Sequence, residues 1–203
     1  MISAMTGARR GDRVTEPPEG LTYAAGFLDP GEERAVLAEV EAMELYEVRM
    51  RGQVAKRTVR HFGYRYDYEA WRLAPVEPLP PSLVWLRDRS GELAGVPGEE
   101  LVEALVTRYP PGAGIGWHRD APMFGPKVVG VSLLSACPLR FQRTVAGSRS
   151  VYELEVEARS AYVLAGQARS AWQHHIPATR AVRYSITFRT LSGRGRVDRS
   201  AAE

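Results

Sequence analysis

The hydrophobic positions change their spacing near residue 100. Before that point, Val36, Leu37, Val40 and Met43 recur at the spacing of one face of an α-helix. The pair Pro80-Pro81 precedes a shorter pattern of the same kind, and proline is favoured in the first turn of a helix. The first half of the chain is therefore expected to contain two helices.

After residue 100, short segments rich in β-branched and aromatic residues follow one another. Turn-forming residues such as Pro110-Pro111-Gly112 and Gly147-Ser148 separate them. The expected strands are residues 104–109, 114–120, 127–135, 139–144, 151–156, 161–164 and 181–191. Seven short strands with tight turns predict a mainly β (α+β) protein, built as a sandwich or jelly-roll barrel with the helices packed on one outer face.

The two ends of the chain differ from the segment between them. Residues 1–20 are polar and contain glycine and proline, and residues 193–203 form a charged tail of small residues, so both are expected to be flexible. Residues 21–192 show no internal repeat and are expected to form a single domain. The length of 203 residues and the hydrophobic content of 44% suit one domain with a full core.

Composition excludes several classes of protein. The single cysteine, Cys137, excludes an internal disulfide and a cysteine-rich zinc site, and it suits the reducing cytoplasm. No stretch is long and apolar enough for a membrane span, and no signal peptide is expected. The net charge of +3 permits a nucleic-acid partner without requiring one. We expect a cytoplasmic monomer that does not associate with membranes.

Three of the four histidines lie in two short segments, and one of them is two residues from a carboxylate. His118 and Asp120 would point to the same face of a strand, and either His174 or His175 could join them from a later strand. An isolated His-x-Asp pair is more often a simple hydrogen-bonded pair. Two imidazoles and one carboxylate leave coordination positions open, which suits Fe(II) that also binds O2 and a cosubstrate, although zinc accepts the same ligands.

The last expected strand carries charge on one face. Its odd-numbered positions are polar and its even-numbered positions are apolar: Arg183, Ser185, Thr187 and Arg189 against Tyr184, Ile186 and Phe188. If the polar face is buried, the two arginines require anions, and a small dicarboxylate would satisfy both through planar hydrogen-bonded forks. The alternative is an ordinary amphipathic strand whose polar face is in water.

Taken in order, five pieces of this chain resemble the AlkB family of Fe(II)- and 2-oxoglutarate-dependent dioxygenases. The pieces are Arg108–Gly112, His118-x-Asp120, Ser132–Leu134, Trp172–Pro177 and Arg183–Arg189. The resemblance implies a double-stranded β-helix (jelly-roll) fold and the cofactors Fe(II), 2-oxoglutarate and O2. It also implies an oxidoreductase that acts by oxidative demethylation of alkylated bases in DNA or RNA, as in nucleic-acid repair.

The resemblance also implies roles for individual residues. It assigns His118, Asp120 and His174 to iron, and Tyr109 and Arg183 to the far carboxylate of 2-oxoglutarate. Arg189 would lie near the carboxylate that chelates the metal, which places it in the catalytic set, and Ser185 and Thr187 would line the cosubstrate site. Pro122 stands where some nucleic-acid demethylases have an acidic residue that helps to read the base, so the identity of the substrate stays open.

A candidate substrate lid occupies residues 48–72, where cationic and aromatic side chains alternate. Its candidate contacts are Arg57, Arg60, His61, Phe62, Tyr64 and Tyr66. Cations can contact phosphates and rings can stack on an extruded base, although the same pattern suits a β-ribbon whose rings pack on the barrel. The alternatives to base demethylation are a 2-oxoglutarate-dependent hydroxylase or demethylase acting on protein or a small molecule, and a binding module without turnover.

Overall fold

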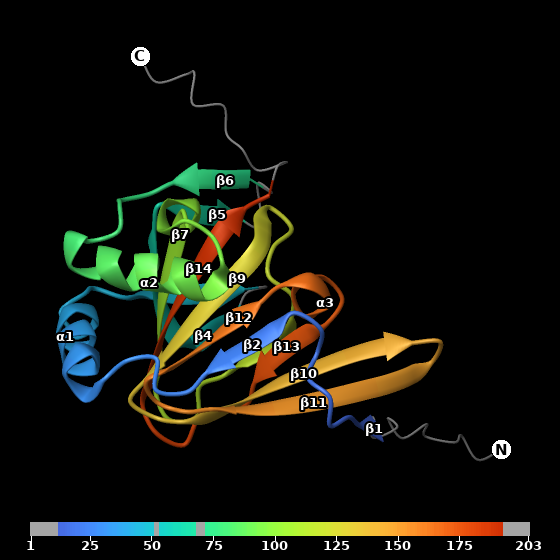
Figure 1. The fold of residues 1–203 in the computed structure, drawn as a ribbon. Helices are drawn as coiled ribbons and strands as arrows, with labels where there is room; N and C mark the ends of the chain where they lie inside the picture. The colour runs from blue at the N-terminus through green and yellow to red at the C-terminus, as the bar shows by residue number, and fades with distance from the viewer. Residues whose placement is uncertain (1–11, 51–52, 68–71, 193–203) are drawn as a thin grey trace.

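The computed structural model describes residues 12–50, 53–67 and 72–192, and its strands form two sheets that face each other and a short two-stranded ribbon (Figure 1). The larger sheet has the order β2-β12-β9-β14-β7-β4-β3, and the smaller sheet has the order β1-β11-β10-β13-β8. Chain neighbours are therefore mostly separated in space, as in a jelly roll. The predicted mainly β, jelly-roll fold is confirmed.

The elements have the following bounds. In the larger sheet they are β2 (Leu21–Ala24), β3 (Tyr46–Met50), β4 (Gln53–Phe62), β7 (Glu103–Tyr109), β9 (Phe124–Leu133), β12 (Ser160–Leu164) and β14 (Arg183–Leu191). In the smaller sheet they are β1 (Asp12–Arg13), β8 (Ile115–His118), β10 (Cys137–Val145), β11 (Ser148–Val156) and β13 (Gln173–Ile176). The ribbon is β5 (Tyr64–Asp67) with β6 (Arg72–Pro75), and the α-helices are α1 (Pro30–Glu41), α2 (Val84–Ala94) and α3 (Gly166–Ser170).

Helices α1 and α2 cover one outer face of the larger sheet, as predicted (Figure 1). Val36 and Val40 of α1 and Leu86 of α2 pack in one core with Ile186 and Phe188 of β14. Helix α1 begins at a capping box, because Asp29 Oδ1 accepts from the backbone of Glu32 at 2.8 Å and Glu32 Oε2 accepts from the backbone of Asp29 at 2.9 Å. Burial of the even-numbered face of β14 leaves its odd-numbered face toward the smaller sheet.

A second core lies between the two sheets. It contains Phe141 and Leu139 of the smaller sheet, together with Val128, Tyr162 and Leu164 of the larger sheet. The candidate site adjoins this core, because Val128, Tyr162 and Leu164 also line the cavity of that site.

The sequence-based prediction missed several elements. Strand β13 was not among the seven expected strands, and neither were the strands that precede residue 100. Part of the predicted flexible N-terminal segment is also paired, since Asp12–Arg13 lies parallel to β11. The rest of that segment up to residue 11, together with residues 193–203, lies outside the described residues. Within the described residues, no helix combines the length and hydrophobicity that a membrane crossing requires.

Candidate active site between the two sheets

Strand pairing places His118 and His174 directly opposite each other. Strands β8 and β13 are antiparallel with His174 facing His118, and the centres of the two imidazole rings lie 4.2 Å apart. Asp120 follows the end of β8, and its Oδ2 lies 3.6 Å from His174 Nε2. All three side chains line one internal cavity, so the three predicted metal ligands come together.

His175 lies on the opposite face of β13. Its ring packs against Trp117 with the ring centres 4.9 Å apart, and its Nδ1 lies 2.7 Å from the carbonyl oxygen of Ile115. The sequence alone left His174 and His175 as alternatives. The pairing of β13 with β8 and β10 selects His174 for the cavity, because adjacent residues of a strand point to opposite faces.

The protonation states in this cluster suit metal ligands. His118 Nδ1 lies 2.8 Å from the carbonyl oxygen of Gly116, which can only accept, so Nδ1 carries the proton and Nε2 keeps its lone pair. Burial lowers the pKa of His118 and lowers the pKa of His174 to about 3, so both imidazoles are neutral near pH 7. Burial opposes ionisation of Asp120, but Arg189, His174, His118 and Arg169 together outweigh it and hold the pKa of Asp120 below its usual value.

The donor atoms fit a metal in chemical type, and all three side chains line one cavity. One carboxylate oxygen, Asp120 Oδ2, is buried and has no hydrogen-bond partner in the described part of the chain. Among the same residues, no group of three His, Cys, Asp or Glu side chains is already arranged to hold a metal ion. Binding at His118, Asp120 and His174 therefore requires a rotation of at least one side chain.

Arg183 is a fully buried guanidinium with unused donors. Its Nε donates to Ser132 Oγ at 3.0 Å, and its Cζ lies 5.2 Å from the centre of the Tyr109 ring. Within the described residues, Nη1 and Nη2 are both buried without a hydrogen-bond partner. An unpaired buried charge is strongly unfavourable, so this guanidinium suits an anionic ligand such as a carboxylate.

Arg189 differs from Arg183 because protein carboxylates already neutralise it. Its Nε and Nη2 lie 2.8 Å and 2.7 Å from Asp120 Oδ1, and its Nη1 donates to Glu103 Oε2 at 2.7 Å. Glu103 is fully buried, and its other oxygen lies 3.3 Å from His61 Nδ1. The sequence-based expectation that one dicarboxylate would satisfy both arginines is corrected here: Arg189 holds the candidate metal ligand, and Arg183 is the arginine with unpartnered donors.

The hydroxyl groups of β14 face the same cavity as Arg189. Ser185 and Thr187 line it, together with Tyr109 of β7 and Tyr162 of β12. The ring of Tyr162 reaches the cavity because it lies over Gly130, where any side chain would collide with it. Burial raises the pKa of Tyr162, so its phenol stays protonated.

Two residues of this site were missed by sequence reasoning. Tyr162 gave no signal, since its neighbours Ala161, Val163 and Leu164 are apolar and its own ring suits a hydrophobic core. Glu103 did give one: it precedes an expected strand and lies two residues before Leu105, on the face that Thr107 and Tyr109 share. A charged residue on that face of a buried strand marks an ion pair.

The cavity itself has a volume of about 60 Å³, which holds only a few water molecules. It is enclosed by the two sheets and by Arg57 of β4. Loading the site with a dicarboxylate therefore requires side chains at its border to move.

The lid candidates on β4 point to two opposite faces of the strand. Register with β7 places Val59 opposite Thr107 and His61 opposite Leu105, so Arg57 and His61 belong to the cavity face. Arg60 and Phe62 lie on the other face, which corrects their assignment as lid contacts. Phe62 is buried in the core beneath the helices.

The remaining lid candidates are also engaged with the protein. Arg60 Nε donates to Glu77 Oε1 at 2.6 Å, and its Nη1 donates to the carbonyl oxygen of Glu44 at 2.9 Å. Tyr66 is buried, with its ring centre 6.5 Å from that of Phe124, and Tyr64 packs beside it. The prediction that these rings stack on a base is therefore wrong for Tyr66 in this arrangement, because hydrophobic packing covers it.

Comparison with curated proteins identifies relatives at low identity. The chain is 25% identical to the tRNA (carboxymethyluridine(34)-5-O)-methyltransferase alkbh8 of Xenopus tropicalis, over 78% of this chain and 25% of that protein. It is 25% identical to the Alkylated DNA repair protein ALKBH8 homolog of Arabidopsis thaliana, over 78% of this chain and 51% of that protein. It is also 25% identical to the Probable RNA/DNA demethylase ALKBH6 of Danio rerio, over 80% of this chain and 71% of that protein. The chain thus spans a quarter to a half of the ALKBH8 relatives.

Solved structures share the fold. OsALKBH1 superposes with a TM-score of 0.66 at 14% identity, covering 87% of this chain and 99% of that one. A Pseudomonas putida prolyl-4-hydroxylase superposes with a TM-score of 0.59 at 18% identity, covering 85% of this chain and 93% of that one. The model of the 2OG-Fe(II) oxygenase superfamily matches residues 20–189. Since that match covers most of the chain, the protein belongs to the 2OG-Fe(II) oxygenase superfamily of oxidoreductases, and it is similar to the AlkB homologues named above.

Proposed function

We propose that this protein is an Fe(II)- and 2-oxoglutarate-dependent dioxygenase that oxidatively demethylates alkylated bases in DNA or RNA. The observation that carries the proposal is a fully buried guanidinium with two unpartnered donors, that of Arg183, which stacks on Tyr109 at the border of the cavity that His118, Asp120 and His174 line. The relatives named for nucleic-acid substrates support the choice of substrate class.

Each side chain has a distinct task in this proposal. His118, Asp120 and His174 would hold Fe(II), which together with 2-oxoglutarate and O2 supplies the oxidation of a substrate C–H bond. Arg183 would bind the far carboxylate of 2-oxoglutarate in a planar fork, with Tyr109 and Ser132 fixing the guanidinium. The cosubstrate would thereby be oriented toward the three ligands.

Arg189 and Glu103 would hold the carboxylate of Asp120 in position. Arg189 binds Asp120 through Oδ1 alone, which leaves Oδ2 for another partner. Glu103 in turn fixes Arg189 from the opposite side. The side chains of Arg189, Glu103 and Asp120 are almost completely buried, which strengthens each of these charge interactions.

One observation favours the alternative of a protein or small-molecule substrate. Phe62 and Tyr66, two of the aromatic lid candidates, are buried and unavailable for stacking on a base in this arrangement. A hydroxylase or demethylase of either kind would use the same metal and cosubstrate chemistry.

A panel of methylated oligonucleotides tests the proposal. The protein is incubated with Fe(II), ascorbate, 2-oxoglutarate and each oligonucleotide in turn. The masses of the product oligonucleotides are then measured by mass spectrometry. Loss of a methyl group with matching succinate formation is the expected result. Succinate formation that no methylated DNA or RNA stimulates would contradict base demethylation and favour the alternative.

A further inference from the structure

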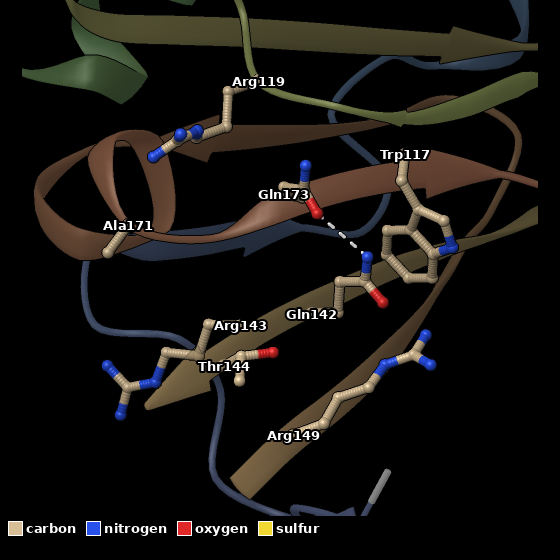
Figure 2. Close-up of a pocket in the computed structure, with 8 residues that line it drawn as sticks. All are labelled: Trp117, Arg119, Gln142, Arg143, Thr144, Arg149, Ala171 and Gln173. Atoms are coloured by element: carbon tan, nitrogen blue, oxygen red, sulfur yellow. Dashed lines mark hydrogen bonds between the residues drawn. The ribbon is translucent and has the colours of Figure 1, made fainter. Parts of the chain in front are cut away.

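A second and larger groove lies on the outer face of the smaller sheet, behind the strands that carry His118 and His174. It has a volume of about 590 Å³ and is lined from β8, β10, β11 and β13 (Figure 2). The lining residues that matter here are Trp117, Arg119, Gln142, Arg143, Arg149 and Gln173. None of the site residues described above is among them.

The groove carries positive charge that the protein does not neutralise. Its described lining residues include three arginines and no acidic residue. Arg119 Nη1 donates to the carbonyl oxygen of Ser170 at 3.1 Å, and Arg143 Nη1 donates to Gln167 Oε1 at 2.6 Å, so their partners are neutral. By contrast, Arg140 on the same face is paired with Glu153 at 2.6 Å. The charge of the groove is therefore available to an anionic ligand.

The floor of the groove contains two uncharged side chains that are held by a hydrogen bond. Gln142 Nε2 donates to Gln173 Oε1 at 2.9 Å, and Arg149 Cζ lies 5.9 Å from the centre of the Trp117 ring. Figure 2 shows the three arginines on different sides of this glutamine pair, rather than gathered around one point. Separated cations suit the successive phosphates of an extended chain better than a single ion.

The position of β8 connects the groove to the internal cavity. β8 is the edge strand of the smaller sheet, and the segment from residue 117 to 120 alternates between the two sites. Trp117 and Arg119 line the groove, whereas His118 and Asp120 line the cavity. A cavity of about 60 Å³ admits only a small group, so the remainder of a polymeric substrate must be held outside it.

We propose that this groove binds the phosphate backbone of a single nucleic-acid strand, which reaches the cavity across the edge of β8. The inference rests on the proposed function, because it assigns a second contact surface to the same substrate class. It adds Arg119, Arg143 and Arg149 as phosphate contacts, none of which lines the cavity of the metal ligands.

The test measures binding without turnover. Anisotropy of a labelled, unmethylated single-stranded oligonucleotide is followed at several salt concentrations for the full chain and for the double variant Arg143→Gln/Arg149→Gln. We expect the double variant to bind at least about tenfold more weakly and to lower the slope of log K against log salt by about 1.4, since each phosphate contact on a single strand contributes about 0.7. Arg34→Gln/Arg180→Gln, a change of two exposed arginines outside the groove, removes the same charge elsewhere and should change neither quantity.

A charge-preserving variant separates loss of charge from loss of folding. Arg143→Lys/Arg149→Lys should keep the wild-type slope. Equal weakening by the lysine and glutamine variants would overturn the proposal, as would wild-type affinity in the glutamine variant. Inorganic phosphate that displaces the oligonucleotide at an equal concentration of phosphate groups would show a site for single ions. Polyglutamate that binds as tightly as the oligonucleotide would show a site for an acidic protein. Either result would overturn the proposal.

The groove and the proposed reaction can fail separately. If the glutamine variant loses oligonucleotide binding but the wild-type protein removes no methyl group from any oligonucleotide, the groove assignment stands and the reaction does not. If the wild-type protein demethylates an oligonucleotide and the glutamine variant binds it unchanged, the reaction stands and the groove assignment is wrong.

Discussion

Arg189 Nη1 lies 2.7 Å from Glu103 Oε2, and both side chains are almost completely buried. The other side of the same guanidinium contacts Asp120, so a fully buried carboxylate supports a candidate metal ligand through one arginine. His61 of β4 contacts Glu103 in turn. The candidate metal site is thus coupled by charge to a strand of the other sheet.

Glu103→Gln should destabilise the protein by about 2 kcal/mol, because it removes a buried charge-assisted hydrogen bond to Arg189, which keeps only Asp120 as its counterion. Urea denaturation measures this loss. Glu153→Gln is the matched control, since its pair with Arg140 is largely exposed and should contribute less than about 1 kcal/mol. Equal losses in the two variants would contradict the role given to Glu103.

His118→Ala and Asp120→Ala should each abolish succinate formation, because each removes one of the three candidate metal ligands. His175→Ala is the control, since its ring packs against Trp117 on the opposite face of β13. It should retain most of the turnover in the same assay. Normal turnover in either ligand variant, with iron and 2-oxoglutarate supplied, would remove the metal assignment.

Arg183→Met should separate stability from cosubstrate binding. The substitution removes an unpaired buried charge, so the urea midpoint of the protein alone should rise. The KM for 2-oxoglutarate should increase at least about tenfold, because a hydrogen bond to a charged group contributes about 1.5–3 kcal/mol. Arg180→Met, an exposed arginine just before β14, should affect neither quantity. Unchanged saturation by 2-oxoglutarate in Arg183→Met would exclude the carboxylate role.

Arg57→Gln should weaken oligonucleotide-stimulated turnover more than Arg60→Gln does. Arg57 lines the cavity, whereas Arg60 lies on the opposite face of β4 and is bound to Glu77. Succinate formation at rising oligonucleotide concentration distinguishes the two variants. A larger effect of Arg60→Gln would reverse the assignment of the two faces.

Much of the site could be predicted because strands impose a period of two. Alternation placed Ser185 and Thr187 on one face of β14 and Ile186 on the other, and the structure has them there. The same rule, applied to β4, would have separated His61 from Phe62. The lid prediction failed on Phe62 because the cationic and aromatic residues were grouped by composition alone.

Other features depend on contacts between distant residues, which a single sequence does not encode locally. The choice of His174 over His175 depends on how β13 pairs with β8. The pair of Arg189 with Glu103 joins residues 86 positions apart. Local pattern identified these residues as unusual in type, but only the sheet register determines their partners.

The alternation along Trp117, His118, Arg119 and Asp120 makes the spacing of this segment as important as its composition. A single residue inserted ahead of Trp117 would exchange the two faces, turning the indole inward and the imidazole toward solvent. Insertions and deletions in this segment should therefore be tolerated only when they add or remove two residues. This holds even though β8 is a short edge strand, where a change of length would otherwise have little effect.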